Sequence, residues 1–339
     1  MLPGYEPGLA SVIIPTRNRP AMTCEAVASC RSQTYRPIEV IVVDDGSSDD
    51  TAAAVETAAR HDPTGADAGF TVRVLRQDHR GAPAARNRGL CESRGEFIQF
   101  LDSDDLLLPD KLQRQVEHLQ SHPELMFNYT IALNVDAAGN VLWSYGEPMP
   151  APGRAALISG YFWDTPAPLI RRDLCRRIGP WDEQLASNQE LEYFSRLKAL
   201  DRRGAFIPEP GHQRRLHDEA SISQQARSRD ALRWAVSRER ALERMIALVR
   251  DADLWVAAER QVLARQLRLG AEYYALAGDR DGVRRCLRRS ARVAAGLRKV
   301  RFAFNVLLAL WFPLALPLYW HRRRVRHRQR RWRRAAAAG

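Results

Sequence analysis

The sequence is poor in cysteine, with five among 339 residues, and no two of them stand in a CxxC spacing. An odd number of cysteines without paired spacing argues against a disulfide framework and against a zinc cluster, and it favours a reducing compartment. The first ten residues, MLPGYEPGLA, hold neither a basic segment nor an apolar run. We therefore expect no secretory signal.

Glycine-rich phosphate loops are also missing, because neither GxGxxG nor a Walker sequence occurs. These are the signatures that hold a dinucleotide or a triphosphate. Their absence disfavours a nucleotidyltransferase, a class of enzyme that also uses acidic metal sites on α/β sheets.

The first hundred residues alternate short apolar, β-rich runs with amphipathic helical segments, a pattern typical of βαβ units in a mostly parallel sheet. The run IEVIVV is apolar nearly throughout, as a strand covered on both faces should be. The expected strands are 10–14, 38–43, 71–75 and 97–101, and the expected helices are 21–33, 50–60, 83–93 and 110–120.

The rest of the chain changes character after residue 127. Residues 127–145 predict a hairpin around DAAGN, and helices are expected at 173–178 and 189–200, with a short strand at 205–207. Residues 226–298 are rich in Arg, Ala and Leu at helical spacing and predict two or three helices, with a helical hairpin turning at Gly278–Gly282.

Polar residues are concentrated where three of the expected strands end: PTRNR at 15–19, DDGSSD at 44–49 and DSDD at 102–105. In a parallel α/β sheet the carboxyl ends of the strands form the ligand-binding edge, so we expect these loops to share one edge. Clustered carboxylates suit Mg²⁺ or Mn²⁺. The alternatives are an acidic surface turn, and a cap on the following helix by Ser48 or Asp49.

Four stretches in a fixed order carry a more specific signal: SVIIPTRNRP, IEVIVVDDGSSDDT, GAPAARNRGL…RGEFIQFLDSDD and PLIRRDLCRRIGPWDEQL. Together they resemble the family 2 glycosyltransferases, inverting enzymes of the GT-A fold, over residues 10–223. The resemblance implies a GT-A domain over residues 1–224. We expect a helical region at 225–300 and an apolar membrane-associating segment with an Arg-rich tail at 301–339 to follow it.

The resemblance also implies a nucleotide-sugar donor, most often a UDP-sugar. By motif position, Thr16 and Asn18 would line the nucleoside pocket, and Asp45, with Asp44, would hold the base or ribose. The family's histidine-plus-serines segment resembles RRLHDEASIS, which would bring His217 to the phosphate or the metal.

Five further positions complete the implied donor site. Arg86 and Asn87 of the ARN element would lie near the donor. Asp102 and Asp104 would bind Mg²⁺ or Mn²⁺, with Asp105 supporting them. A cation there would stabilise the charge that develops on the diphosphate leaving group.

The general base departs from the family pattern. The family usually supplies Asp from a Glu-Asp pair, whereas this chain has Gln189-Glu190, which makes Glu190 the expected base and Glu192 its competitor. A solvated acidic helix face is the alternative to a general base here. The departure at Gln189-Glu190 keeps open a catalytically silent nucleotide-sugar-binding or scaffold protein of the same fold. The processive QxxRW element is approached only by Asp230–Trp234, which lacks the glutamine, so transfer of a single sugar is favoured.

Residues 302–320 are nineteen uncharged residues, long enough as a helix to span about 28 Å. Nine arginines and no acidic residue follow at 322–334, and removing these nine charges lowers the formal net charge from +12 to +3. A spanning helix would put the arginines outside, against the positive-inside tendency. Pro313 and Pro317 favour instead a re-entrant or interfacial segment on anionic headgroups.

We therefore expect residues 302–334 to bind the membrane surface from the cytoplasmic side of the inner (plasma) membrane, because nucleotide-sugars are generally cytosolic. The acceptor would be a lipid-linked or envelope glycan, and no nucleic acid partner is expected. A buried helix packed on the preceding region is the other interpretation of residues 302–320.

Overall fold

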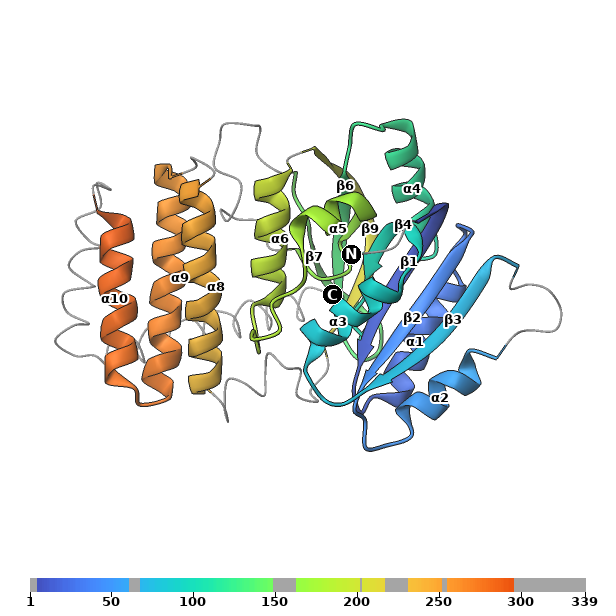
Figure 1. Cartoon of the computed structure of the whole chain (residues 1–339), viewed down its shortest axis with the longest axis horizontal. Helices are drawn as coiled ribbons and strands as arrows, with labels where there is room; N and C mark the ends of the chain where they lie inside the picture. The colour runs from blue at the N-terminus through green and yellow to red at the C-terminus, as the bar shows by residue number, and fades with distance from the viewer. Residues whose placement is uncertain are drawn as a thin grey trace. The chain divides into compact units, whose positions relative to one another are not determined.

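A computed structural model describes residues 5–60, 68–148, 163–201, 203–216, 231–251 and 255–295 (Figure 1). The chain divides into two compact units. The first comprises residues 1–149, 163–183 and 200–216, and the second comprises residues 150–162, 184–199 and 217–339.

The first unit is built on a nine-stranded sheet in the order β3-β2-β1-β4-β8-β6-β9-β5, with β7 paired to β6. The strands are β1 Glu6–Thr16, β2 Ile38–Asp45, β3 Phe70–Gln77, β4 Gly95–Phe100, β5 Asp105–Leu107, β6 Phe127–Val135, β7 Val141–Tyr145, β8 Pro168–Arg171 and β9 Gly204–Arg215.

The half of the sheet formed by β3, β2, β1 and β4 is parallel, as the alternating pattern predicts. Every residue of β2 is buried, which fits a strand covered on both faces. Thr16 pairs with Asp44 in the register, and Ile13 pairs with Phe100. The carboxyl ends of these strands therefore lie along one edge of the sheet.

The other half of the sheet corrects the expectation of a mostly parallel sheet. β8 runs antiparallel to β4 and β6, β7 to β6, and β5 to β9, and β6–β9 is the parallel pair of this half. Part of the reason is local, because the short turn between β6 and β7 can join only antiparallel strands. The described fold is thus a mixed α/β sheet.

Helices cover both faces of this sheet: α1 Pro20–Arg31, α2 Thr51–Ala58, α3 Ala82–Glu92, α4 Lys111–Ser121 and α5 Arg172–Ile178. α1, α2 and α4 contribute to one core cluster with the strand residues Val12, Val40 and Phe97. α3 packs on β1 and β2. A Cβ at Gly89 would lie 2.4 Å from Ile13 Cγ2, so the glycine permits this close approach of α3 to the sheet.

The second unit is helical, with α6 Gln189–Leu200, α8 Ala231–Asp251, α9 Ala257–Leu276 and α10 Arg280–Ala294. α9 packs against both α8 and α10. Gly278 has φ +76°, and Asp279 accepts a hydrogen bond from Gly282 N at 2.9 Å, so the predicted helical hairpin turns here.

Among the described helices, none is long and apolar enough to cross a membrane. Residues 302–334, for which membrane association is predicted, lie outside the described residues.

Candidate active site at the carboxyl edge of the parallel strands

The loops after β1 and β2 are bonded to each other at the edge where the sequence predicts a shared site. Asn18, with φ +52°, donates its N–H to Ser47 Oγ at 2.9 Å, and its Oδ1 accepts from Ser48 N at 2.8 Å. Arg19 N donates to Thr51 Oγ1 at 3.0 Å. Asp49 Oδ1 accepts from Thr51 N at 3.0 Å, so this residue also supports the start of α2.

Thr16 and Asp44, which pair across β1 and β2, make short local bonds at this edge. Thr16 Oγ1 lies 2.6 Å from Thr23 Oγ1 of α1. Asp44 Oδ1 accepts from Ser47 N at 3.0 Å. Both side chains are buried, so each helps to fix the shape of the edge.

Asp45 anchors the loop between β3 and α3. Its buried carboxylate accepts from Gln77 Nε2 at 2.8 Å, Arg80 N at 2.8 Å and Gly81 N at 2.7 Å, and it lies 2.8 Å from His79 Nδ1. Burial alone would raise the pKa of Asp45, but these hydrogen bonds outweigh it and lower the pKa below its usual range. The loop after β3, which the sequence did not single out, therefore joins the site through Asp45.

Asp102, Asp104 and Asp105, the acidic trio, are brought together as predicted. Each offers a carboxylate oxygen, and these oxygens lie within 4.8 Å of one another. Arg86 Nη2 lies 2.6 Å from Asp102 Oδ1, and Arg19 Nη1 lies 2.5 Å from Asp104 Oδ2. Part of the negative charge is thus balanced by two arginines of the same site.

Asp105 begins β5 opposite Arg214 of β9 and is buried. Burial, and then the charges of Asp104, Asp102 and Asp164, raise the pKa of Asp105 well above its usual range. Burial would lower the pKa of Arg214, but these carboxylates raise it. The three carboxylates fit a divalent cation in donor chemistry, since Mg²⁺ and Mn²⁺ prefer oxygen ligands and a cation would relieve this repulsion.

Arg86 and Asn87, adjacent on α3, do different things. The Arg86 guanidinium, paired with Asp102, also lies 4.6 Å from the ring centroid of Trp181. Asn87 Nδ2 donates to Trp181 O at 3.0 Å and to Glu183 Oε1 at 2.9 Å, and its Oδ1 accepts from Trp181 N at 2.8 Å. Asn87 therefore holds the PWDE segment, while Arg86 reaches the acidic trio.

Glu190 lies in the first turn of α6, in the second unit, and is half-buried. The start of α6 is fixed by α8, because Ser187 N donates to Ser237 Oγ at 3.0 Å and Arg238 Nη1 donates to Asn188 Oδ1 at 2.7 Å.

Glu192, the competing candidate for the base, is 1% exposed, and both of its oxygens are bound by Arg196, at 2.8 and 2.9 Å. This contact makes Glu192 part of a buried ion pair of α6.

The sequence missed two arginines of this site. Arg19 follows Asn18 by one residue, and Arg215 donates its Nε to Asp104 O at 2.5 Å and its N–H to Asp105 Oδ1 at 3.3 Å. Their positions within PTRNR and RRLHD were the available signal. His217, two residues after Arg215, lies outside the described residues.

Solved structures share this architecture. Staphylococcus aureus TarS 1–349, crystallised in complex with UDP-GlcNAc, matches with a TM-score of 0.65 at 17% identity, covering 93% of this chain and 91% of that one. A mannosyltransferase, PcManGT of Pyrobaculum calidifontis, in complex with GDP-Man and Mn²⁺, matches with a TM-score of 0.52 at 20% identity, covering 97% and 86%. These matches define the class of fold as GT-A-like with a helical C-terminal region.

A family model matches part of the chain. Residues 11–165 match glycosyl transferase family 2. The chain therefore carries a glycosyl transferase family 2 domain, and the resemblance predicted from the four motifs is confirmed.

Two named relatives show how far the similarity extends. An uncharacterized glycosyltransferase of Rickettsia bellii is 32% identical over 134 residues, 40% of this chain and 18% of the relative. A Campylobacter jejuni GalNAc(5)-diNAcBac-PP-undecaprenol β-1,3-glucosyltransferase is 38% identical over 103 residues, 30% of this chain and 31% of the relative. The match thus spans a minor part of each relative's length.

Proposed function

We propose that the protein transfers a single sugar, with inversion at the anomeric carbon, from a nucleotide-sugar to a hydroxyl of a lipid-linked or envelope glycan acceptor. The carrying observation is the acidic trio at the carboxyl edge of the parallel strands of a family 2 domain, within 4.8 Å of one another. UDP-GlcNAc in TarS supports a UDP-sugar as the donor.

Asp102 and Asp104, with Asp105 behind them, would hold Mg²⁺ or Mn²⁺. When bound, the cation would supply positive charge to the diphosphate leaving group. Arg19 and Arg86 contact the trio and keep two further cationic groups at this position. Asp45 fixes the loop after β3, and Asn18 fixes the loop after β2, so the edge is preorganised for a donor before it binds.

Glu190 is the proposed general base, which takes the proton from the acceptor hydroxyl. The buried, bidentate pairing of Glu192 with Arg196 supports this assignment, because a carboxylate held on both oxygens is a poor proton acceptor.

We further propose that the enzyme works at the cytoplasmic side of the inner membrane through residues 302–334. The apolar run followed by nine arginines supports this location.

The test is release of nucleotide from a panel of nucleotide-sugars, with and without Mn²⁺ or Mg²⁺, by wild type, Asp104→Asn, Glu190→Gln and Asp173→Asn. Asp173 is an acidic residue in the first turn of α5 and is the matched control. One donor should be hydrolysed in a metal-dependent way, and Asp104→Asn should lower that rate at least about 100-fold, since it removes a charge beside the leaving group.

Glu190→Gln should keep slow donor hydrolysis, which can use water without the acceptor base, and should lose transfer to lipid-linked acceptors. Tight donor binding without turnover would favour a catalytically silent nucleotide-sugar-binding protein. Equal activity of Asp104→Asn and Asp173→Asn would overturn the assignment of the acidic trio.

A further inference from the structure

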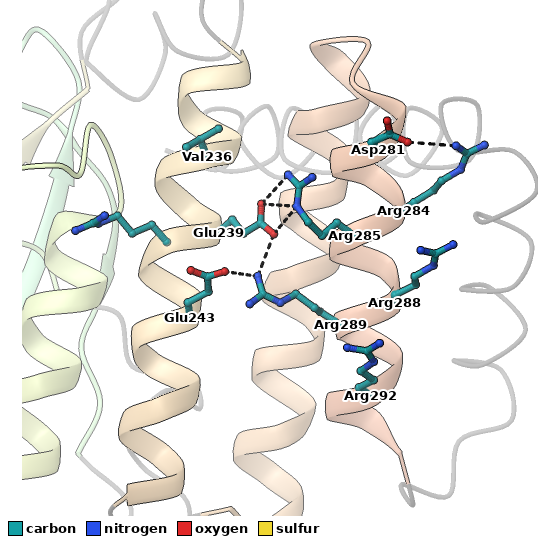
Figure 2. A pocket seen from close by; sticks show the side chains of 10 residues that line it. Val236, Glu239, Glu243, Asp281, Arg284, Arg285, Arg288, Arg289 and Arg292 are labelled. Carbon is teal, nitrogen blue, oxygen red and sulfur yellow. Dashed lines mark hydrogen bonds and ion pairs between the residues drawn. The ribbon is translucent and has the colours of Figure 1, made fainter.

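A groove of about 800 Å³ in the second unit is lined by α8 and α10 (Figure 2). Its lining includes six arginines and three acidic residues. We call it the arginine groove; its arginines are Arg240, Arg284, Arg285, Arg288, Arg289 and Arg292.

The acidic residues of the groove bind only some of these arginines. Glu239 of α8 lies 3.1 Å from Arg285 Nε and 3.0 Å from Arg289 Nη1, and it also accepts from Tyr274 Oη at 2.6 Å. Figure 2 shows Arg285 and Arg289 reaching from α10 toward Glu239 and Glu243, with Arg284 beside Asp281.

Arg288 and Arg292 are two groove arginines that none of the three acidic residues binds, and we call them the surplus arginines. Both are exposed, and in the part of the chain that the structure describes neither side chain makes an ion pair or a hydrogen bond. They stand one turn apart on α10, and Arg284 stands one turn before Arg288. Like charges at this spacing destabilise a helix by about 0.2–0.5 kcal/mol per pair, so the arrangement has no benefit for the isolated helix.

The remaining face of α10 is already covered. Val283, Cys286 and Leu287 are buried in a cluster with Tyr274 of α9. At about 100° per residue, the five arginines of α10 that line the groove span about 140° of its circumference, opposite this buried face. The helix can therefore present guanidinium groups to an anionic surface but has no free apolar stripe to insert into one.

We propose that the arginine groove binds the phosphate groups of an anionic phospholipid surface. Guanidinium groups bind phosphate oxygens in bidentate geometry, and Arg288 and Arg292, which meet no described partner, leave such contacts open. The continuation of the chain argues for lipid as the source of the phosphate. Arg298, Lys299 and Arg301 follow α10 closely, and the nineteen uncharged residues 302–320 come next.

This site shares no residue with the predicted membrane segment 302–334, but its assignment to lipid rests on the proposed membrane location of that segment. In this proposal α10 makes a second contact with the membrane surface, and this contact is purely electrostatic. Because each basic residue near an anionic surface contributes about 1 kcal/mol, about fivefold in partition coefficient, the two surplus arginines should contribute about thirtyfold together.

The experiment is flotation of the full chain with vesicles of phosphatidylcholine alone or with 30% phosphatidylglycerol, over a range of lipid concentrations. Arg288→Ala/Arg292→Ala is compared with Arg60→Ala/Arg265→Ala, which removes two exposed charges elsewhere. The first variant should lower the partition coefficient on anionic vesicles about thirtyfold and the second by much less. Circular dichroism and donor turnover should be unchanged in both.

An equal loss of binding in the two double variants would mean that net charge alone drives binding. No loss in Arg288→Ala/Arg292→Ala would mean that the groove does not touch lipid. Either result overturns the proposal. Calorimetry with inorganic diphosphate distinguishes a soluble phosphate compound from the lipid surface as the ligand of the groove. Binding of diphosphate that the variant abolishes, with unchanged flotation, would assign the groove to a soluble phosphate compound and exclude the lipid surface.

Discussion

The two units of this protein each gather charge, and they treat it in opposite ways. In the first unit the carboxylates of the acidic trio meet Arg86, Arg19 and the backbone of Arg215. In the second unit six arginines line the groove together with three acidic residues. Part of the charge of the acidic trio is compensated by arginines of its own site, whereas the lining of the arginine groove holds twice as many basic as acidic residues.

The difference bears on how each site would recognise a ligand. A compensated cluster acts at short range, through oxygen atoms held in place by neighbouring loops, and depends little on salt. An uncompensated groove attracts anions over the distance that salt allows, about 10 Å at 0.1 M ionic strength. We therefore expect substitutions in the first unit to act through structure and those in the groove to act through its field.

The largest effect on folding should come from Asp45→Asn in the first unit, which removes a buried carboxylate charge that neighbouring hydrogen-bond donors hold. The new amide nitrogen would face the backbone N–H of either Arg80 or Gly81, which bind different oxygens of Asp45, so one of these donors would lose its acceptor. We expect a loss of about 3 kcal/mol in the free energy of unfolding at pH 7, measured by urea denaturation. Because the folded pKa of Asp45 is lowered, this contribution is present above pH 4 and should be lost as the pH falls further.

Asp78→Asn is the matched control, since Asp78 lies in the same loop, is exposed and makes no side-chain hydrogen bond or ion pair with a described residue. It should change the free energy of unfolding by less than about 0.5 kcal/mol. A similar loss in both variants would mean that the hydrogen bonds of Asp45 do not hold this loop.

Glu239→Gln should have the next largest effect, about 2 kcal/mol of destabilisation, because it removes the charge that binds Arg285 and Arg289. Burial would raise the pKa of Glu239, but the hydrogen bonds from Arg285 and Tyr274 lower it. Its stabilising contribution is thus present above about pH 4.5 and is lost as the pH falls, so urea denaturation from pH 7 to pH 3 should show the two proteins converging.

The control for that experiment is Glu243→Gln, one turn along α8, where the carboxylate is 49% exposed and, among the described residues, pairs with Arg289. Exposed pairs contribute about 0–1 kcal/mol, so its effect should be the smaller. Equal effects would show that burial of Glu239 adds nothing to the pairing.

The sequence was informative wherever the structure depends on local pattern. Alternating apolar runs located β1 to β4, and polar residues at their ends located Asn18, Asp45 and the acidic trio. The positions of β8 and β9 in the sheet depend on pairings between distant segments, which no local period encodes. The contact between Arg19 and Asp104, 85 residues apart, was invisible for the same reason.

The charge balance of the groove could not be predicted either. Arg285 and Arg288 have the same chemistry and stand three residues apart on α10, yet one meets Glu239 and the other meets no described partner. Which arginine is paired with a carboxylate depends on the packing of α10 against α9 and of α9 against α8. Composition alone gives only the total number of arginines.

The smallest predicted effect on stability comes from comparing Arg288 with Arg285 on α10. Arg288→Ala should stabilise the protein by about 0.5 kcal/mol in 20 mM NaCl, because it relieves the repulsion from Arg284 and Arg292. The gain should disappear in 500 mM NaCl, where the charges are screened. Arg285→Ala, which leaves the buried Glu239 with one fewer cation, should instead destabilise the protein by about 1 kcal/mol at both salt concentrations.

Urea denaturation of the two variants at both salt concentrations measures the sign as well as the size of each change. If Arg288→Ala is destabilising and its effect does not depend on salt, Arg288 has a structural role, and the groove is compensated in a way that resembles the acidic trio. A stabilisation that salt removes means that Arg288 is held at a cost to folding, which is the condition expected of a residue retained to bind an anion from outside the fold.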